Sequence, residues 1–327
     1  RDLHSFPTRR SSDLTGPLGR RTFLNTRINV NWGALESHAA VEAPTVRVND
    51  AFTSGGAQVT GGRHAASLNF LSDLDYIRGI HSIRTGIQFQ WLYYHADSNA
   101  NYLGTYTFDS LEAYQAGRPS NYTRRFGNPF VEYGGPIGGI YIQDDIRVSK
   151  ALTLSPGLRY EGMIHINNLY NFGPRMGVTW APFKSGRTTL RASSGIFYDY
   201  LTADAYEQTI RVNGINQREV NIVNPTYPDP GALTFTPGNR YLFADEMAMP
   251  RNLRLSTGFD QTFSPKARVS VSYAYVHGER LFRGLNLNPP VGGVRPDPGF
   301  ANVVEVSGDA STRQHQLTTN MNLSLSS

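Results

Sequence analysis

Residues 137–199 contain four consecutive runs in which apolar and polar side chains alternate. In the first run Ile140 and Ile142 share one phase, and Gln143 and Arg147 share the other. The other runs occupy 152–161, 171–180 and 189–199. A period of two is typical of β-strands, because successive side chains leave a strand on opposite faces. The polar phase carries charges and glycines along each run, which is typical of transmembrane barrel strands, although soluble antiparallel sheets also alternate.

Six further runs alternate in the same way. They occupy 22–32, 63–76, 81–94, 251–263, 267–277 and 313–325. Between the ten runs, every second connection is short and the others are longer, which is expected of strands that cross a membrane repeatedly. The sequence therefore predicts an all-β fold, an antiparallel transmembrane β-barrel or part of one, with about ten strands and alternating short turns and long loops.

Composition narrows the function classes. Charged residues make up 17% of the 327 residues, against roughly 25% in an average soluble domain. There is no cysteine, which excludes disulfides and thiolate metal sites. The lysines Lys150, Lys184 and Lys266 each fall in an expected short turn, either as solvated turn residues or because these turns share one compartment. No basic cluster with interleaved aromatics indicates nucleic-acid binding.

The segments outside the runs give fewer signals. Residues 1–14 match nothing that follows and resemble translated adapter sequence, so we predict a non-native segment, with a genuine basic tail as the alternative, and leave it out of the fold prediction. Residues 109–117 favour one short helix capped by Asp109. The longest loop is expected at 201–250, where turn dipeptides recur.

Charged side chains in the polar phase, together with one glutamine, are the candidate lumen residues. They are Gln143, Asp145, Arg147, Arg159, Glu161, Arg175 and Arg191. Asp144, Asp145 and Glu161 could instead be paired catalytic carboxylates, but a ladder of lumen charges explains them better. The histidines lack metal-ligand spacing. We predict no catalytic site, no metal and no cofactor.

Aromatic residues suggest two roles. Ring side chains in the strands fit a girdle at the membrane interfaces: Trp32, Trp91, Tyr93, Tyr94, Tyr160, Trp180, Tyr273 and Tyr275. The loop tyrosines are alternatively platforms for stacking sugars: Tyr102, Tyr106, Tyr114 and Tyr122.

Two stretches together carry a family resemblance. The first reads IYIQDDIRVSKALTLSPGLRYEG from residue 140, and the second reads NFGPRMGVTWAPFKSGRTTLRASSGIFYD from residue 171. They resemble the barrel of Oar-like TonB-dependent receptors. The pattern positions are Gln143, Asp144, Asp145, Arg147, Val148, Gly157, Leu158, Arg159, Tyr160, Glu161, Asn171, Phe172, Pro174, Arg175, Gly177, Gly195, Phe197, Tyr198 and Asp199. Ile146 replaces the tryptophan of the family pattern.

The resemblance implies a location and partners. We expect the bacterial outer membrane, contact with its lipid, and uptake or surface binding of a bulky ligand such as an oligosaccharide, a peptide or a chelate. Energy would come from the TonB complex through a plug that this chain lacks. Because the plug and the final aromatic strand are missing and family barrels have about twice the strands, we expect residues 15–327 to be an internal piece of a receptor barrel.

Asp144 conflicts with strict alternation, which places it in the apolar phase beside Ile142. A charge at the midplane of the lipid face costs on the order of 2 kcal/mol or more. We therefore predict a bulge or a position near the rim, with a local slip that lets Asp145 keep its polar phase.

Two rival functions remain at this stage. One is a passive porin-like channel, which an encoded plug would exclude. The other is a soluble all-β binding or adhesion module, which predicts long connections at both ends of the sheet. The resemblance favours a receptor that is not an enzyme.

Overall fold

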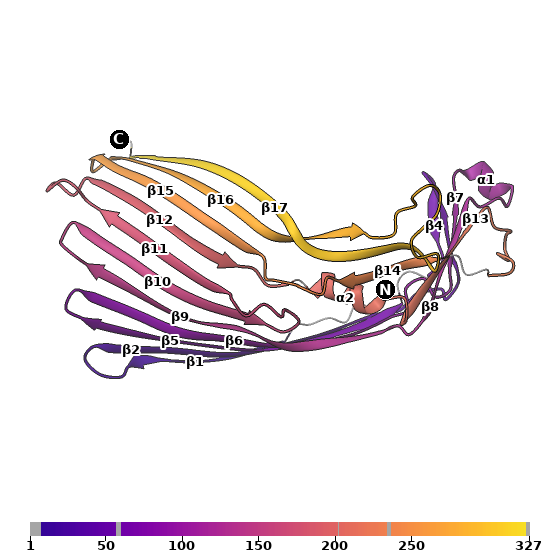
Figure 1. Cartoon of the computed structure of the whole chain (residues 1–327), viewed down its shortest axis with the longest axis horizontal. Helices are drawn as coiled ribbons and strands as arrows, with labels where there is room; N and C mark the ends of the chain where they lie inside the picture. Colours follow the sequence, from indigo (N-terminus) through magenta and orange to yellow (C-terminus); the bar gives the residue numbers. More distant parts are fainter. Residues whose placement is uncertain (1–7, 57–59, 202, 234–236, 325–327) are drawn as a thin grey trace.

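Antiparallel strands dominate the chain because the alternating runs pair with their neighbours in sequence. The computed structural model describes residues 8–56, 60–201, 203–233 and 237–324. They form a 12-stranded sheet and a 5-stranded sheet, called here the large sheet and the small sheet. The large sheet is open, because its edge strands β1 and β14 do not pair with each other. Figure 1 shows the small sheet beyond one end of the large sheet.

The large sheet contains all ten strands predicted from the alternating runs and two more, β1 and β14. In spatial order its strands are β1 (Thr8–Pro17), β2 (Thr22–Ser37), β5 (Gly61–Arg78), β6 (His81–Ser98), β9 (Phe130–Arg147), β10 (Leu152–Met163), β11 (Phe172–Trp180), β12 (Thr188–Tyr198), β15 (Arg251–Ser264), β16 (Ala267–Asn286), β17 (Phe300–Leu323) and β14 (Gly238–Phe243). Among the described strands of the large sheet, β14 and β17 form the one parallel pair.

Residues 8–14, which the fold prediction left out, belong to the large sheet. They form most of β1, which pairs with β2 from Thr8 opposite Trp32 to Pro17 opposite Phe23. Residues 1–7 lie outside the described residues. The non-native origin of the segment is a separate matter and stays a prediction.

The connections keep the predicted parity. Short turns at 18–21, 79–80, 148–151, 181–187 and 265–266 join β1–β2, β5–β6, β9–β10, β11–β12 and β15–β16. Because these pairs are antiparallel hairpins, all five turns lie at one end of the sheet, called here the turn end (Figure 1). The opposite end, which carries the longer connections, is the loop end. The three lysines therefore lie at the turn end.

Three long connections build the small sheet, which the sequence pattern did not reveal. Its strands, in spatial order, are β13 (Gln217–Val223), β8 (Asn121–Gly127), β7 (Thr105–Phe108), β3 (Thr45–Val48) and β4 (Phe52–Ser54). The β2–β5 connection supplies β3 and β4, the β6–β9 connection supplies β7 and β8, and the β12–β15 connection supplies β13. Short strands with few alternations are indistinguishable from loop in the sequence.

Two helices complete the described structure. They are α1 (Leu111–Gln115) and α2 (Ala203–Arg211). Ser110 caps α1 by accepting a hydrogen bond from the Ala113 backbone N–H at 3.2 Å, so the prediction of Asp109 as the cap is wrong by one residue. Asp109 instead accepts a hydrogen bond from the Ser120 hydroxyl at 2.7 Å. In the described residues, neither helix has the length or apolarity to cross a membrane.

The strand β9 starts at Phe130, seven positions before residue 137, and contains the glycine-rich segment GGPIGG at 134–139. Glycine allows β9 to approach β6 closely: a Cβ added at Gly134 would lie 2.4 Å from the Leu92 carbonyl oxygen, and one at Gly138 would lie 2.5 Å from that of Gln88. Glycine carries no alternation signal, so the sequence could not indicate this part of the strand.

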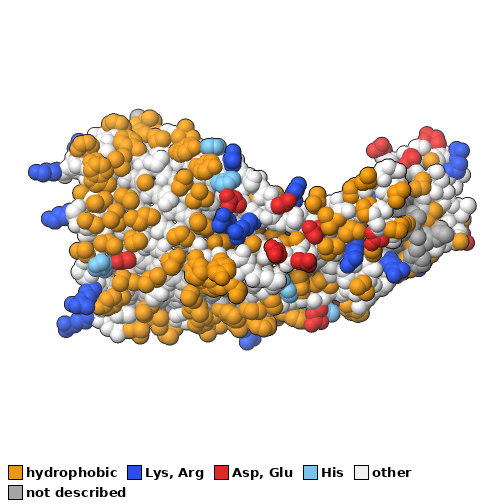
Figure 2. All heavy atoms as spheres, viewed as in Figure 1, with side chains coloured by type: hydrophobic (Ala, Val, Ile, Leu, Met, Phe, Trp, Pro, Cys, Tyr) orange, Lys and Arg blue, Asp and Glu red, His pale blue; other side chains and the backbone are white. Residues whose placement is uncertain are grey.

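The two faces of the large sheet have different chemistry. Residues in register with Ile87 and Ile140 form the apolar face, and residues in register with Arg84 and Gln143 form the polar face. Ile140 is 56% exposed and Trp91 is 50% exposed. Figure 2 shows hydrophobic side chains spread over one face of the large sheet, with basic side chains at the turn end.

The hydrophobic cores of the described residues lie at the loop end. Among the described residues, the fully buried hydrophobic side chains belong to the small sheet, to loop segments or to the loop ends of β6, β9 and β12. The rest of the large sheet buries polar groups, such as Glu161 and Asp260, and exposes apolar ones. A sheet with this inverted distribution is stable only where its apolar face meets an apolar medium.

Candidate functional site on the polar face of the large sheet

Ion pairs and a tyrosine hydrogen bond connect strands of the polar face at several positions along the strands. Arg84 of β6 donates a hydrogen bond to Asp75 of β5 at 2.6 Å, because the two residues stand directly opposite each other in the register. Arg191 and Asp260 lie 2.7 Å apart between β12 and β15. Tyr141 donates to Asp73 at 2.5 Å. These three contacts join β6 with β5, β12 with β15 and β9 with β5, and the two ion pairs neutralise charges that face the same side.

The Arg159–Glu161 pair is the most enclosed ion pair of this face. The Arg159 Nε lies 2.6 Å from a Glu161 carboxylate oxygen, and their side chains are 15% and 8% exposed. Arg159 also donates to Gln88 at 2.9 Å, and Tyr200 donates to Glu161 at 3.4 Å. The pair therefore connects the wall of the sheet to the loop that follows β12.

The sequence-predicted lumen residues share the polar face but do not converge on one point. Their register positions place Gln143, Asp145, Arg147, Arg159, Glu161, Arg175 and Arg191 in the phase of Arg84. Asp144 and Asp145 leave β9 on opposite faces, so they cannot act as a pair of carboxylates on one substrate. The geometry fits a distributed lining rather than a catalytic centre.

Asp144 lies on the apolar face, at the rim of the turn end. Its carboxylate lies 2.5 Å from the His81 Nδ1 and accepts from the Ser82 backbone N–H at 3.1 Å. The predicted rim position is correct. The predicted bulge and slip are wrong, because the β6–β9 register continues unchanged from His81 opposite Ile146 to Arg84 opposite Gln143. A polar partner at the rim removes the need for a bulge.

The family-pattern positions divide between the faces and the strand ends. Gly157 and Gly177 lie on the polar face, and Tyr160 and Pro174 lie on the apolar face. Tyr198 is buried in a loop-end cluster with Met247 and Met249. Asp199 directly follows β12 and accepts a hydrogen bond from Asn252 at 2.5 Å.

The pattern positions Arg175 and Phe197 meet on the polar face. The Arg175 guanidinium carbon lies 4.2 Å from the centre of the Phe197 ring, and that of Arg254 lies 5.0 Å from it. Gly195 stands between them, opposite Arg175 in β11 and opposite Arg254 in β15. We call Arg175, Phe197 and Arg254 the arginine–phenylalanine stack.

Sequence reasoning missed several residues of this face. Arg84 and Asp75 could have been found, because a hairpin turn at Gly79 places them opposite each other. Arg254 could not, because the long 199–250 connection hides which residue of β15 faces Gly195. The girdle prediction is wrong for Tyr94, which is buried on the polar face and donates to Glu207 of α2 at 2.8 Å.

The loop end of the polar face is covered by α2. Ile210 packs against the cluster of Tyr94, Ala96 and Val131. The small sheet above it has a core of Val48, Tyr106, Phe108 and Tyr122. Tyr106 and Tyr122 are each 3% exposed, so the proposal that they stack sugars is wrong for these two, while Tyr102 and Tyr114 are half-buried.

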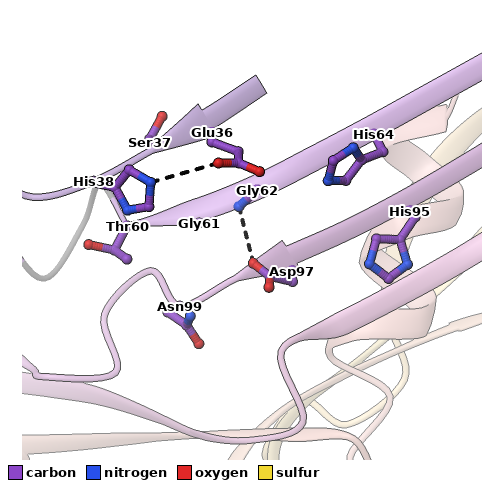
Figure 3. Close-up of a pocket in the computed structure, with 10 residues that line it drawn as sticks. All are labelled: Glu36, Ser37, His38, Thr60, Gly61, Gly62, His64, His95, Asp97 and Asn99. Carbon is purple, nitrogen blue, oxygen red and sulfur yellow. Dashed lines mark hydrogen bonds and ion pairs between the residues drawn. The ribbon is translucent and has the colours of Figure 1, made fainter. Parts of the chain in front are cut away.

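A polar pocket lies at the loop end on the other face (Figure 3). His64 and His95 are directly opposite in register, with ring centres 6.0 Å apart, and Asp97 accepts from the Gly62 backbone N–H at 3.1 Å. Within the described part of the chain, no three His, Cys, Asp or Glu residues gather in a way that could hold a metal ion. The pocket forms a polar rim beyond Trp91 of the apolar face.

Comparisons with known proteins agree with this architecture. A family model described as "Outer membrane beta barrel domain" matches residues 7–170 and 162–327. The comparison with curated protein sequences gives no match.

Three solved structures illustrate the similarity of fold. The outer membrane transporter YddB from Escherichia coli has 17% identity and a TM-score of 0.68, with 98% of this chain and 39% of that chain covered. The siderophore receptor PirA from Acinetobacter baumannii has 8% identity and a TM-score of 0.56, with 98% and 42% covered. The FrpB iron transporter from Neisseria meningitidis has 12% identity and a TM-score of 0.55, with 98% and 42% covered. This chain thus spans less than half the length of each.

Proposed function

This chain belongs to the family of outer membrane β-barrel domains, and from that premise we propose that it is part of the wall of an Oar-like, TonB-dependent receptor. The protein resides in the bacterial outer membrane, with its apolar face against lipid. We propose that it takes up or binds at the surface a bulky ligand, such as an oligosaccharide, a peptide or a chelate, and that it is not an enzyme.

The observation that carries this proposal is the asymmetry between the two ends of the large sheet. Five short turns lie at one end, and three long connections at the other end pair with one another in the small sheet. Pairing ties the three connections together, so they form one ordered body above the strand ends. Such a body offers a binding surface at the entrance, which a passive channel does not need.

The solved structures that share the fold support the proposal by analogy. They are described as a transporter, a siderophore receptor and an iron transporter. The Oar-like pattern positions add a second argument, since two of them build the arginine–phenylalanine stack on the polar face. Energy would come from the TonB complex acting through a plug.

The division of the chain is also a proposal. We propose that residues 15–327 are one part of a receptor barrel and that residues 1–14 are not natural sequence. The apolar face of β1 supports the second statement, because Arg10 and Ser12 stand opposite Val30 and Ile28 of β2. Polar side chains at lipid-facing positions are costly.

The two rival functions, a soluble all-β module and a porin-like channel, differ in what separates them from the proposed receptor. A soluble all-β module predicts long connections at both ends of the sheet, whereas the structure has them at one end. A porin-like channel shares the fold, so uptake measurements must separate it from a receptor.

The test is uptake by the source bacterium with and without the gene region for residues 15–327. The probes are radiolabelled maltoheptaose, a decapeptide, ferric citrate and the small sugar arabinose. We expect uptake of one bulky probe to fall to the level of a strain without TonB, with arabinose unchanged. A loss of arabinose uptake that does not depend on TonB would instead support the porin-like channel.

A further inference from the structure

The ion pairs of the polar face do not include the two arginines of the arginine–phenylalanine stack. Among the described residues, Arg175 and Arg254 take part in no ion pair, whereas Arg84, Arg159 and Arg191 each have a carboxylate within 2.7 Å. The Arg175 Nε is buried and has no hydrogen-bond acceptor. An unsatisfied buried donor is costly, and more so on a charged group.

Glycine at position 195 makes the stack possible. A Cβ there would lie 3.0 Å from the Arg175 Cγ and 3.1 Å from the Phe197 ring, tighter than ordinary contacts. The phenyl ring therefore lies over Gly195, where both guanidiniums reach it from the neighbouring strands. Stacking fixes the plane of each guanidinium and leaves its N–H edge free to donate.

The spacing of the two arginines selects the kind of ligand. Arg175 in β11 and Arg254 in β15 are separated by one strand, β12, which places their backbones roughly 10 Å apart at the usual strand spacing. From these backbones the two guanidiniums converge on one ring, since their carbons lie 4.2 Å and 5.0 Å from the centre of Phe197. A ligand with two or more carboxylates can give each guanidinium its own partner, because a carboxylate matches the planar fork of an arginine.

A cavity at the loop end of the polar face is also lined by basic side chains. Arg63, Arg125 and Arg211 line it, together with Glu207. Glu207 is already paired with Arg211, and Arg125 lies 3.8 Å from the Glu219 carboxylate, while its Nε is buried without an acceptor. A ligand that enters past α2 would meet this cavity before the stack, with positive charge at both.

We propose that Arg175 and Arg254 bind a ligand that carries at least two carboxylates, such as a polycarboxylate chelator or an acidic peptide. This inference rests on the proposed function, since it assigns a chemical class to the ligand that passes along the polar face. Phe197 is a positioning residue, because it orients the guanidiniums and makes no polar contact of its own.

The experiment is equilibrium dialysis of the full chain, extracted from the outer membrane in non-ionic detergent, against radiolabelled citrate, tetraglutamate, inorganic phosphate and sucrose. We expect saturable binding of citrate and of tetraglutamate, weaker binding of phosphate, and none of sucrose. Tighter binding of tetraglutamate than of citrate would assign the carboxylates to a peptide. Arg175→Gln and Arg254→Gln should each weaken binding about tenfold or more, because a charge-assisted contact is lost.

Three further variants separate charge from geometry. Arg175→Lys keeps the charge without the fork, and Phe197→Leu keeps both charges without the stack; each should weaken citrate binding several-fold. Arg268→Gln removes one arginine of the same face near the turn end and should change affinity less than twofold. Heat-modifiable gel migration, which reports the folded large sheet, should be the same for all variants.

Two results would overturn the inference. One is citrate binding by the folded wild type that does not exceed sucrose binding. The other is unchanged citrate affinity in the Arg175→Gln/Arg254→Gln double variant. If uptake by cells persists while citrate does not bind, the ligand class is wrong and the receptor function stands. If citrate binds but no probe depends on the gene for uptake, the receptor function is wrong and the site stands.

Discussion

The large sheet and the small sheet are built from the same chain, yet they bury opposite kinds of side chain. In the small sheet, aromatic and aliphatic residues turn inward, and Phe108 is 0% exposed. In the large sheet Ile140 and Ile142 are more than half exposed, while the Glu161 side chain is 8% exposed. The small sheet is organised as in a water-soluble protein, and the large sheet as in a membrane protein.

The difference shows that alternation alone does not identify the surroundings of a sheet. Each sheet places one kind of residue on each face, and the medium decides which face is covered. Lipid takes the role in the large sheet that the side chains of Val48, Tyr106 and Tyr122 take in the small one. The two sheets should therefore respond in opposite ways to the same type of substitution.

The largest effect is expected from truncating the core of the small sheet. Phe108 packs edge-on against Tyr114 and Tyr227, with ring centres 5.2 Å and 5.3 Å away. Phe108→Ala should lower the free energy of unfolding by about 3–5 kcal/mol. We expect this loss to unfold a sheet of such short strands. We expect the three long connections to become sensitive to protease while the heat-modifiable migration of the large sheet persists.

The matched truncation in the large sheet is Ile140→Ala. Because Ile140 faces lipid, detergent or lipid chains fill the space and little stability is lost. Protease resistance of the connections in Phe108→Ala would contradict the view that the small sheet depends on its own core.

The second prediction is that an introduced charge destabilises the large sheet more than the small sheet. Ile140 lies midway along the apolar face, between Asp144 at the turn end and Trp91 toward the loop end. Ile140→Arg should destabilise the protein in lipid vesicles by about 2–4 kcal/mol. Val223→Arg introduces the same charge at a 72% exposed position of the small sheet and should stay within about 0.5 kcal/mol.

Urea unfolding of vesicle-inserted protein, followed by tryptophan fluorescence, measures the first of these changes, and protease resistance measures the second. Equal tolerance of arginine at both positions would show that the apolar face does not contact lipid.

A smaller effect tests the helix α1, which lies between β7 and β8 of the small sheet and which the sequence predicted. Ser110→Ala removes the hydroxyl that caps α1 and should cost about 1 kcal/mol locally. Hydrogen exchange at the Ala113 amide is the measurement, because this N–H donates to the Ser110 hydroxyl. Asp109→Ala should leave that amide unchanged, and faster exchange in this variant would restore Asp109 as the cap.

How far the sequence could predict the structure also differs between the two sheets. The ten alternating runs of the large sheet are long enough to show period two, so their strands and the parity of their connections were predictable. The small sheet was not, because β4 has three residues and β3 and β7 have four each. Its order depends on pairing among connections that lie far apart in the sequence, such as β13 with β8.

The same limit applies to the candidate site. The phase of Arg159 and Arg175 followed from alternation within one strand. The role of Gly195 and the contribution of Arg254 depend on which strands are neighbours and on their register, which one sequence does not specify across a long connection. Asp144 shows a further limit: a local conflict in the pattern was visible, but its solution by His81 required the β6–β9 register.

The smallest effect concerns the hydroxyl groups that the small sheet buries. Tyr106 donates a hydrogen bond to the Pro228 carbonyl oxygen at 2.7 Å. Burial raises the pKa of Tyr106 to about 12, and nearby Tyr122 and Asp229 act in the same direction. An unfolded tyrosine has a pKa of about 10. The folded small sheet thus holds the neutral phenol in a range where the unfolded chain would release its proton.

The sign of the pH dependence follows from this difference. The contribution of Tyr106 to the stability of the small sheet is fully present below pH 10 and is lost as the pH rises toward 12. Protease resistance of the connections should therefore decline over this interval. Tyr106→Phe lacks the titrating group and should show a shallower decline, although it loses a hydrogen bond worth about 1 kcal/mol. Burial also raises the pKa of Tyr122, so the decline should be reduced rather than abolished. An equally steep decline in the variant would assign the pH dependence to other groups.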